Sequence, residues 1–239
     1  MSPARRRKAR PSPSARRRPG AARVTTSPDT VAAAHAALRE AAHALGALEH
    51  AAALPLAEAI EVVMATLESG GTVYFCGNGG SAADAQHFAC ELAGRFTMER
   101  PALAAVALTT NTSSLTAIGN DFGYEQVFSR QLEGLGVAGD ALIAITTSGA
   151  SASVVRAVEA AHQLGMTVIG MTGRRGARFA ALCDVALVTP HESTPRVQEG
   201  HLLLGHALCA LVERGLFASR AGRRTGRARG ARRGGAARR

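Results

Sequence analysis

The chain has few aromatic residues, no closely paired cysteines and no long apolar run. It lacks Trp, and aromatic residues make up only 4% of its 239 positions. Its four cysteines are scattered through apolar surroundings without a CxxC pair, a pattern typical of buried free thiols in a reducing compartment. No apolar run reaches the roughly 18 residues of a membrane span, and no signal-peptide pattern opens the chain. We therefore expect a cytoplasmic protein with no membrane partner.

Acidic residues are absent from both ends of the chain. Residues 1–27 and 217–239 contain 18 of the 28 Lys and Arg residues and no Asp or Glu, whereas residues 28–216 contain all 18 acidic residues. The middle of the chain is therefore acidic, although the whole chain carries a net charge of +10. Because the ends also lack the apolar residues that build a core, we expect disordered arginine-rich tails on either side of a single domain at 28–216.

Three interpretations of these tails remain open. They can reflect an arginine-rich coding bias or a misassigned start, they can adhere weakly to nucleic acid in a salt-sensitive way, or the N-terminal one can be an organelle transit peptide. No aromatic residues are interleaved with the arginines, and no recognition fold is evident. The tails therefore do not support sequence-specific nucleic-acid binding.

Expected strands and helices alternate through the middle of the chain. Apolar, β-branched runs predict strands at 72–76, 104–108, 141–146, 167–171 and 184–188, with helical stretches between them. This alternation is typical of an α/β fold, here a single domain with a five-stranded parallel sheet in a three-layer α/β/α arrangement. An N-terminal helical extension precedes the sheet, and its apolar stripe from Val31 to Leu48 predicts packing on another helix, such as one from a second subunit.

A glycine-rich turn follows the first expected strand. The segment 77–80, Gly-Asn-Gly-Gly, lies between an apolar run and a helix predicted at 81–95, an arrangement that presents backbone N–H groups to an anion. His87 and Glu91 are four residues apart on that helix, so they lie on one face about one turn apart. The pattern indicates an anion site beside a general base and a metal ligand.

A second loop, residues 146–151, places hydroxyl side chains and Gly149 directly after a buried strand. Such a loop at the carboxyl end of a strand favours a phosphate cradle, although an ordinary N-cap of the following helix is the alternative. No lysine follows either glycine loop, which excludes a P-loop nucleotide site, and the GxGxxG spacing of dinucleotide sites is absent. The expected anion is a sugar phosphate.

Polar residues also gather in the first two turns of a C-terminal helix predicted at 195–215. Gln198, Glu199, His201 and His206 stand there among leucines. A single histidine in such a helix is often a core residue, but the concentration of polar side chains favours a functional role.

Four segments together resemble the phosphoheptose isomerases, a family of the sugar isomerase (SIS) domain superfamily. They are Asn78–Arg95, Asn120–Arg130, Thr147-Ser148-Gly149, and Arg196–Glu199 with His206. The match runs in order through roughly residues 30–215. Each segment alone is a weak signal, and the combination is specific.

The resemblance implies a SIS fold and an intramolecular aldose–ketose isomerase. The expected reaction interconverts sedoheptulose 7-phosphate and D-glycero-D-manno-heptose 7-phosphate through an enediol. The family also implies one zinc ion per subunit and a homotetramer with active sites at subunit interfaces.

The resemblance assigns roles position by position. The catalytic pair matches Glu91 and His206, and the zinc ligands match His87, Glu91, Gln198 and His206. The substrate-binding positions are Asn78, Gly79, Gly80, Glu91, Asn120, Asp121, Thr146, Thr147, Ser148, Ser151 and Gln198. The chain departs from the family at Ala150, where Asn is usual, so one polar side chain is lost near the expected phosphate.

The residue types suit this chemistry, but their spacing sets a constraint. Glu91 can move a proton between adjacent carbons, His206 can serve the oxygens, and zinc can polarise the carbonyl. Gln198 and His206 are eight residues apart, about 12 Å along a helix. We therefore expect either that the helix is unwound near Pro195 or that the two residues come from different subunits. His201 is the rival ligand.

Two other functions remain open. One is a non-catalytic SIS-fold adaptor that binds a replication initiator, and the other is a different sugar-phosphate SIS isomerase. An adaptor has no need to keep Glu91, Gln198 and His206 together, so the isomerase is favoured.

Overall fold

The computed structural model describes the backbone of residues 26–231 and the side chains of residues 26–218. It divides into two units at Ala37, which are described separately. In the first unit, residues 28–37 form the beginning of helix α1 (Pro28–Gly46), and the Ser27 hydroxyl accepts a hydrogen bond from the Thr30 N–H at 3.1 Å. This is the helix start that a Ser followed by Pro predicts. The expectations for residues 1–25 and 232–239 lie outside the described residues.

The second unit is built on a parallel sheet with strand order β2-β1-β3-β4-β5. The strands are β1 (Val73–Gly77), β2 (Ala105–Ala107), β3 (Ala141–Ile145), β4 (Thr167–Gly173) and β5 (Val185–Thr189). Every residue of β1 and β3 is buried, as expected of central strands covered on both faces. The strand order reverses between β1 and β3, because the chain goes from β1 outward to β2 and returns to β3.

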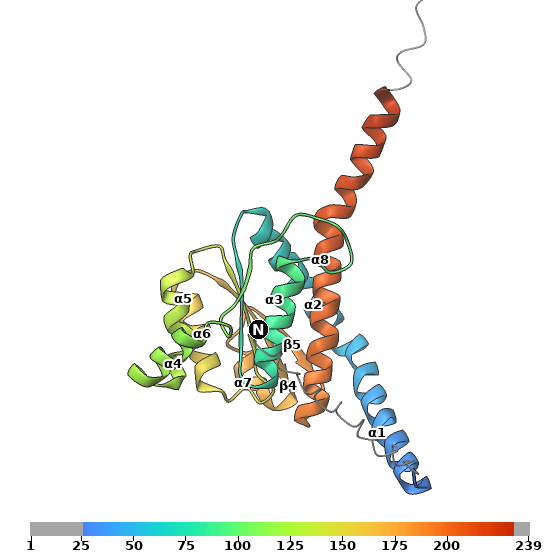
Figure 1. Ribbon diagram of the computed structural model, residues 1–239, viewed down its shortest axis with the longest axis vertical. Helices are drawn as coiled ribbons and strands as arrows, with labels where there is room; N and C mark the ends of the chain where they lie inside the picture. The colour runs from blue at the N-terminus through green and yellow to red at the C-terminus, as the bar shows by residue number, and fades with distance from the viewer. Residues whose placement is uncertain (1–25, 232–239) are drawn as a thin grey trace, which may run out of the picture. The chain divides into compact units, whose positions relative to one another are not determined.

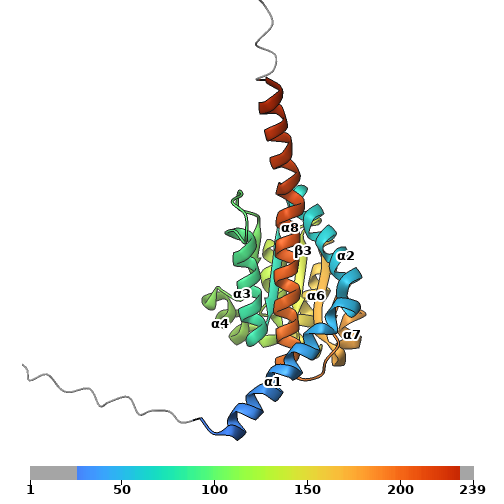
Figure 2. The ribbon, with the colours of Figure 1, turned by 90° about the vertical axis from the view of Figure 1, so that its right-hand side faces the viewer.

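Helices cover both faces of this sheet, as Figures 1 and 2 show. On one face lie α2 (Leu48–Glu68), α3 (Gly80–Ala93) and α8 (Thr194–Ala231), and on the other lie α5 (Ser129–Leu135) and α6 (Ala152–Gln163). Shorter elements complete the unit: α4 (Thr112–Asp121), η1 (Tyr124–Gln126), η2 (Arg174–Gly176) and α7 (Ala177–Ala180). The expected three-layer α/β/α fold is confirmed.

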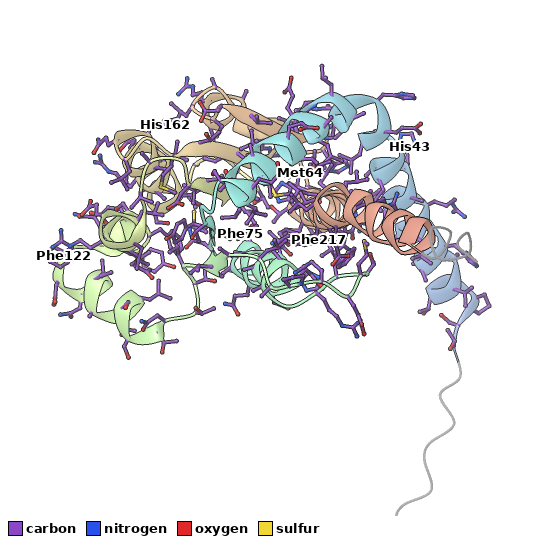
Figure 3. All side chains as sticks on the ribbon, turned by 90° about the horizontal axis from the view of Figure 1, so that it is seen from above. His43, Met64, Phe75, Phe122, His162 and Phe217 are labelled. Atoms are coloured by element: carbon purple, nitrogen blue, oxygen red, sulfur yellow. The ribbon has the colours of Figure 1, made fainter. Side chains whose placement is uncertain are left out.

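Alternate residues of each strand supply two separate cores. Phe75 and Ile143 pack with α2, α3 and α8, whereas their neighbours Tyr74 and Leu142 pack with α5 and α6. This is the period-two alternation of a strand. Figure 3 labels Phe75, which is buried in the first core, and Met64 and Phe217, which are partly buried and pack against it.

Two core helices, α2 and the 194–218 part of α8, are long and apolar enough to cross a membrane by length and composition alone. Charged residues such as Glu58 and Glu213 interrupt both helices, so neither contains an uninterrupted apolar run of the roughly 18 residues that a membrane span needs. Both helices contribute to the first core, for example through Val63 and Leu208. Burial accounts for part of their apolar composition, since 28% of the apolar window of α2 and 44% of that of α8 are buried.

The last helix also differs from the expected domain boundary. Residue 216 was predicted to end the domain, with a disordered tail from 217, but α8 continues to Ala231. Ala and Arg are strong helix formers and favour this continuation of a helix nucleated by packed residues, whereas Gly222, Gly226 and Gly230 oppose it by about 1 kcal/mol each.

The four cysteines are unpaired, and their burial varies. Cys76 and Cys209 are buried as predicted, Cys183 is half-buried, and Cys90 on α3 is exposed, so the prediction of a buried thiol is wrong there. Burial raises the pKa of the Cys76 and Cys209 thiols to about 12. These two thiols stay protonated and unreactive at neutral pH.

Candidate active site

A cavity of about 260 Å³ opens at the carboxyl ends of β1 and β3. It lies where the strand order reverses, the position at which open α/β sheets bind ligands. The lining residues are Asn78, Gly80, Ser81, Ile145, Thr146, Thr147, Ser148, Ser151, Thr194 and Gln198. Both predicted loops therefore meet in one cavity, together with the start of α8.

Three helices begin at this cavity. No side chain caps the N-terminus of α3 at Gly80, and Ser151, the N-cap residue of α6, makes no side-chain cap hydrogen bond. The Ser151 hydroxyl lies instead 3.4 Å from the Thr146 hydroxyl. The interpretation of Ser151 as an ordinary cap is therefore not supported. Uncapped N–H groups and the positive ends of helix dipoles make this cavity suitable for an anion.

Glycines shape both loops. Gly149 has φ +69°, a backbone angle that residues other than glycine rarely adopt. Its N–H donates to the Thr146 hydroxyl at 3.2 Å. A Cβ at Gly80 would collide with the amide of Gln198. Ala150, where the chain departs from the family that its sequence resembles, is exposed and does not line the cavity.

The side chain of Asn78 is fixed by two hydrogen bonds. Its Oδ1 accepts from the Tyr124 hydroxyl, and its Nδ2 donates to the Ser153 hydroxyl, both at 2.9 Å. The second Nδ2 hydrogen takes part in neither of these two hydrogen bonds. Tyr124 and Ser153 were not predicted from the sequence as site residues; Tyr124 was noted only as part of the Asn120–Arg130 segment.

Helices α3 and α8 run parallel and in register along one side of the site, as Figure 2 shows. Gln198 lies against Gly80 at the start of α3, and His206 lies against His87 farther along. The α8 helix is regular from Thr194 onward, so the predicted unwinding near Pro195 is wrong. Within one chain, Gln198 therefore lies at the cavity and His206 lies about 12 Å farther along the helix.

The second part of the site brings together His87, Glu91 and His206. The two histidine Nε2 atoms are 2.7 Å apart, and Glu91 Oε1 lies 3.7 Å from His87 Nε2. The ring of Phe96 lies beside that of His206, with centroids 5.5 Å apart. Asp84, one turn before His87, has an Oδ2 atom without a hydrogen-bond partner; burial raises its pKa, and the nearby His87 opposes this.

The donors of this cluster fit zinc in type. Bonds of about 2.0–2.1 Å at the tetrahedral angle place ligand nitrogens roughly 3.3 Å apart. The distance between the two histidine Nε2 atoms, 2.7 Å, and that between His87 Nε2 and Glu91 Oε1, 3.7 Å, lie on either side of that value. Among residues 26–218, no three His, Cys, Asp or Glu side chains form a complete metal-binding group. One chain thus offers a partial donor set, with Gln198 at the neighbouring cavity.

His201, the rival ligand, lies inside the core. It is fully buried, and neither ring nitrogen has a hydrogen-bond partner. Burial lowers its pKa to about 4, against the opposing effect of the Thr172 carbonyl. His201 is therefore a neutral core residue, and His206 is the histidine that meets His87.

Asn120 and Asp121 do not line the cavity. Both are exposed at the end of α4, and the Asn120 amide donates to the Asp121 carboxylate at 2.8 Å. Tyr124, three residues farther on, connects this segment to Asn78.

Known proteins are similar to this chain in both sequence and fold. The family model of the SIS domain matches residues 38–173. The phosphoheptose isomerase of Rhodospirillum rubrum is 54% identical over 158 residues, which are 66% of this chain and 84% of that protein. The structure of phosphoheptose isomerase from Neisseria gonorrhoeae has a TM-score of 0.72 at 48% identity, covering 78% of this chain and 99% of that one. The corresponding structure from Francisella tularensis has a TM-score of 0.75 at 37% identity, with 77% and 98% covered.

The matched domain and the parallel sheet with its cavity place this chain among the SIS domain proteins. Since relatives with more than half of their aligned residues identical are matched over most of their length, the chain belongs to the phosphoheptose isomerase family.

Proposed function

We propose that this chain interconverts sedoheptulose 7-phosphate and D-glycero-D-manno-heptose 7-phosphate. The main support is the alignment, along α3, of an anion cavity at its start with the group of His87, Glu91 and His206 farther along. Membership in the phosphoheptose isomerase family supports an aldose–ketose isomerisation. No other function is favoured by a comparable observation.

The phosphate would bind at the uncapped helix starts. Thr146, Thr147, Ser148 and Ser151 offer hydroxyl and backbone donors there, and Asn78, Gly79 and Gly80 offer further donors from the other side. Gly80 and His87 are seven residues apart, roughly 10 Å along the helix axis. An open-chain sugar phosphate held at the cavity would thus extend toward the histidines.

The proton transfers are assigned to Glu91 and His206. Glu91 takes a proton from C1 of the ketose and returns it to C2. His206 gives a proton to the C2 oxygen and takes one from the C1 hydroxyl, so the enediol forms and collapses without net gain or loss of protons. Glu91 works only if C1 and C2 lie within reach of its carboxylate, and His206 works only if their oxygens lie within hydrogen-bond reach of its ring.

We propose that His87, Glu91, Gln198 and His206 hold one zinc ion per subunit. When bound, zinc would polarise the carbonyl and stabilise the negative charge of the enediolate. Because α8 is regular from Thr194, Gln198 and His206 of one chain do not converge. The proposed set therefore takes Gln198 from a second copy, in a homotetramer with its sites at subunit interfaces.

Exposed leucines support such an assembly. Leu38 is 69% exposed and Leu54 is 71% exposed. Apolar side chains of this size are suited to cover one another between subunits. We further propose that Asn120 and Asp121 reach substrate in the assembled enzyme, that the enzyme is cytoplasmic, and that the arginine-rich ends make no more than weak nucleic-acid contacts.

The deciding experiment is a coupled assay of the purified chain with sedoheptulose 7-phosphate, with and without added zinc, beside a Glu91→Gln variant. We expect turnover that falls by at least about a thousandfold in the variant, as is usual when a catalytic base is removed. A folded, zinc-loaded protein without any turnover would contradict the proposal and favour a non-catalytic adaptor. Turnover of other sugar phosphates alone would favour a different SIS isomerase.

A further inference from the structure

A buried ion pair lies at the far end of α3 from the anion cavity. Arg100 Nε and Glu213 Oε1 are 2.9 Å apart, and their side chains are 1% and 0% exposed. Removing two charges from water is costly, so such a pair persists only where other contacts satisfy its remaining polar atoms. The proposed reaction assigns no role to either residue.

Glu213 organises the loop that follows α3. Its carboxylate accepts hydrogen bonds from the N–H groups of Phe96, Thr97 and Met98 and from the Thr97 hydroxyl, at 2.7–3.1 Å. Burial alone would raise the pKa of this carboxyl, but these hydrogen bonds outweigh it and lower the pKa to about 2. The charged carboxylate therefore fixes the loop in one conformation. Figure 1 shows this green loop passing alongside α8.

Arg100 closes the end of the helix that carries His87 and Glu91. Its guanidinium donates to the carbonyl oxygens of Glu91 and Leu92 at 2.8 Å and of Gly94 at 3.2 Å. The last carbonyls of a helix have no partners within it, and a positive charge there also complements the helix dipole. Arg100 thus holds the backbone of Glu91 itself.

Phe96 connects this ion pair to His206. Its N–H is held by Glu213, and its ring lies against the His206 ring at a centroid distance of 5.5 Å and an interplanar angle of 30°. Glu213 and His206 are seven residues apart on α8, so they lie on the same face two turns apart. The Phe96 ring therefore limits the rotation of the imidazole that meets His87.

We propose that Arg100 and Glu213 are positioning residues that act on Glu91 through its backbone carbonyl and on His206 through Phe96. The role rests on the proposed function, in which Glu91 and His206 exchange protons with the sugar. The histidines lie between the phosphate cavity and the ion pair. The pair therefore affects the orientation of the reacting groups and leaves substrate binding unchanged.

The test compares Phe96→Leu, Glu213→Gln and the double variant in the full chain. We expect each single variant to lower kcat about tenfold or more with KM within about twofold of the parent, since small misplacements of reacting groups are costly. The double variant should lose no more kcat than Glu213→Gln alone, because Glu213 acts on His206 through Phe96. Fully additive losses would contradict this route.

Phe217→Leu is the matched control. The Phe217 ring lies 6.0 Å from the Arg100 guanidinium, so the change disturbs packing around the same ion pair without altering Phe96. We expect it to lower Tm and leave kcat unchanged. If Phe217→Leu lowers kcat as much as Glu213→Gln at equal loss of Tm, the pair is merely structural.

A second readout does not depend on turnover. The His206 ring protons should shift in the NMR spectrum of Glu213→Gln in the same direction as in Phe96→Leu, because the first change displaces the Phe96 ring from His206 and the second removes it. Arg100→Lys serves where Glu213→Gln does not fold. Unchanged His206 resonances in the folded variant would overturn the positioning role, whereas a parent protein without turnover but with these shifts would contradict only the proposed function.

Discussion

At the scale of single residues, the site depends on side chains that are held in place by neighbours outside the predicted motifs. Asn78 lines the cavity, and its amide orientation is set by Tyr124 and Ser153. Gln198 lines the same cavity because Gly80 has no side chain. The residues of the predicted motifs are thus only part of the site, and the neighbours that hold them in place are the rest.

Tyr124→Phe should weaken substrate binding without affecting the chemical step. The variant loses one hydrogen bond to Asn78, which is worth about 0.5–1.5 kcal/mol, so KM should rise roughly two- to tenfold with kcat nearly unchanged. Steady-state kinetics with the sugar phosphate measure both constants. Tyr74→Phe is the matched control, because it loses a comparable hydrogen bond to the Leu135 carbonyl at the opposite end of the sheet. Equal effects of both changes on KM would contradict the prediction.

Gly80→Ala should impair phosphate binding. The new Cβ would collide with the Gln198 amide, the end of a flexible side chain, and push this amide from its place in the cavity. We expect KM to rise by about tenfold or more, and inorganic phosphate to lose its protection against thermal unfolding. Gly46→Ala, whose Cβ would meet nothing within 4 Å, should leave both quantities unchanged. Normal phosphate protection in the Gly80 variant would exclude this cavity as the phosphate site.

At the scale of elements, the parallel pair of α3 and α8 divides the site into two parts. Their starts lie at the cavity, His87 meets His206 farther along, and Glu213 of α8 binds the loop that follows α3. The first turn of α8 is regular, which keeps Gln198 away from His206. The sequence distance between Gln198 and His206 left open whether both can reach one metal ion. The helix geometry shows that within a single chain their positions lie about 12 Å apart along the helix.

His201→Leu should stabilise the protein against acid. Burial lowers the folded-state pKa of His201 to about 4, below its ordinary value of 6.5, so the unfolded chain takes up a proton in this range and the folded chain does not. The stability from this residue is therefore present above pH 6.5 and is lost as the pH falls toward 4. The leucine variant should lose less Tm between pH 6.5 and 4 than the parent. His162→Leu, which changes an exposed histidine, is the control.

More of the fold than of the candidate site could be predicted from the sequence. Apolar runs such as 141–145 located the strands, because a fully buried strand must be apolar throughout. The Gly-Asn-Gly-Gly turn and the hydroxyl loop located the cavity, because loops at strand ends meet at one edge of a parallel sheet. Arg100 and Glu213 were missed, since two charged residues 113 positions apart give no local pattern, although Glu213 directly after the apolar run 207–212 was a usable signal.

At the scale of the whole molecule, the described core ends later than the sequence suggested. Leu216 and Phe217 pack in the first core, and α8 runs on to Ala231. The packed part of α8 therefore includes Phe217, one residue beyond the boundary predicted at 216.

Truncation after Ala218 should preserve Tm and turnover, whereas truncation after Gly215 should lower both. The shorter chain loses Leu216, which is 6% exposed, and Phe217, which lies near Arg100. Burial of such side chains contributes about 1.5–3 kcal/mol each. Thermal unfolding and the coupled assay measure the outcome at moderate salt. Equal behaviour of the two truncated chains would contradict the packing of these residues.

The sequence by itself determined the three-layer fold and the two loops that line the cavity, because periodic burial and turn chemistry are local properties of a chain. Only the tertiary structure decided which side chains meet. It placed His206 beside His87 and left His201 neutral in the core, since both histidines lie on one helix and differ only in the direction they face. It also joined Arg100 to Glu213, since contacts between distant positions depend on how the helices pack.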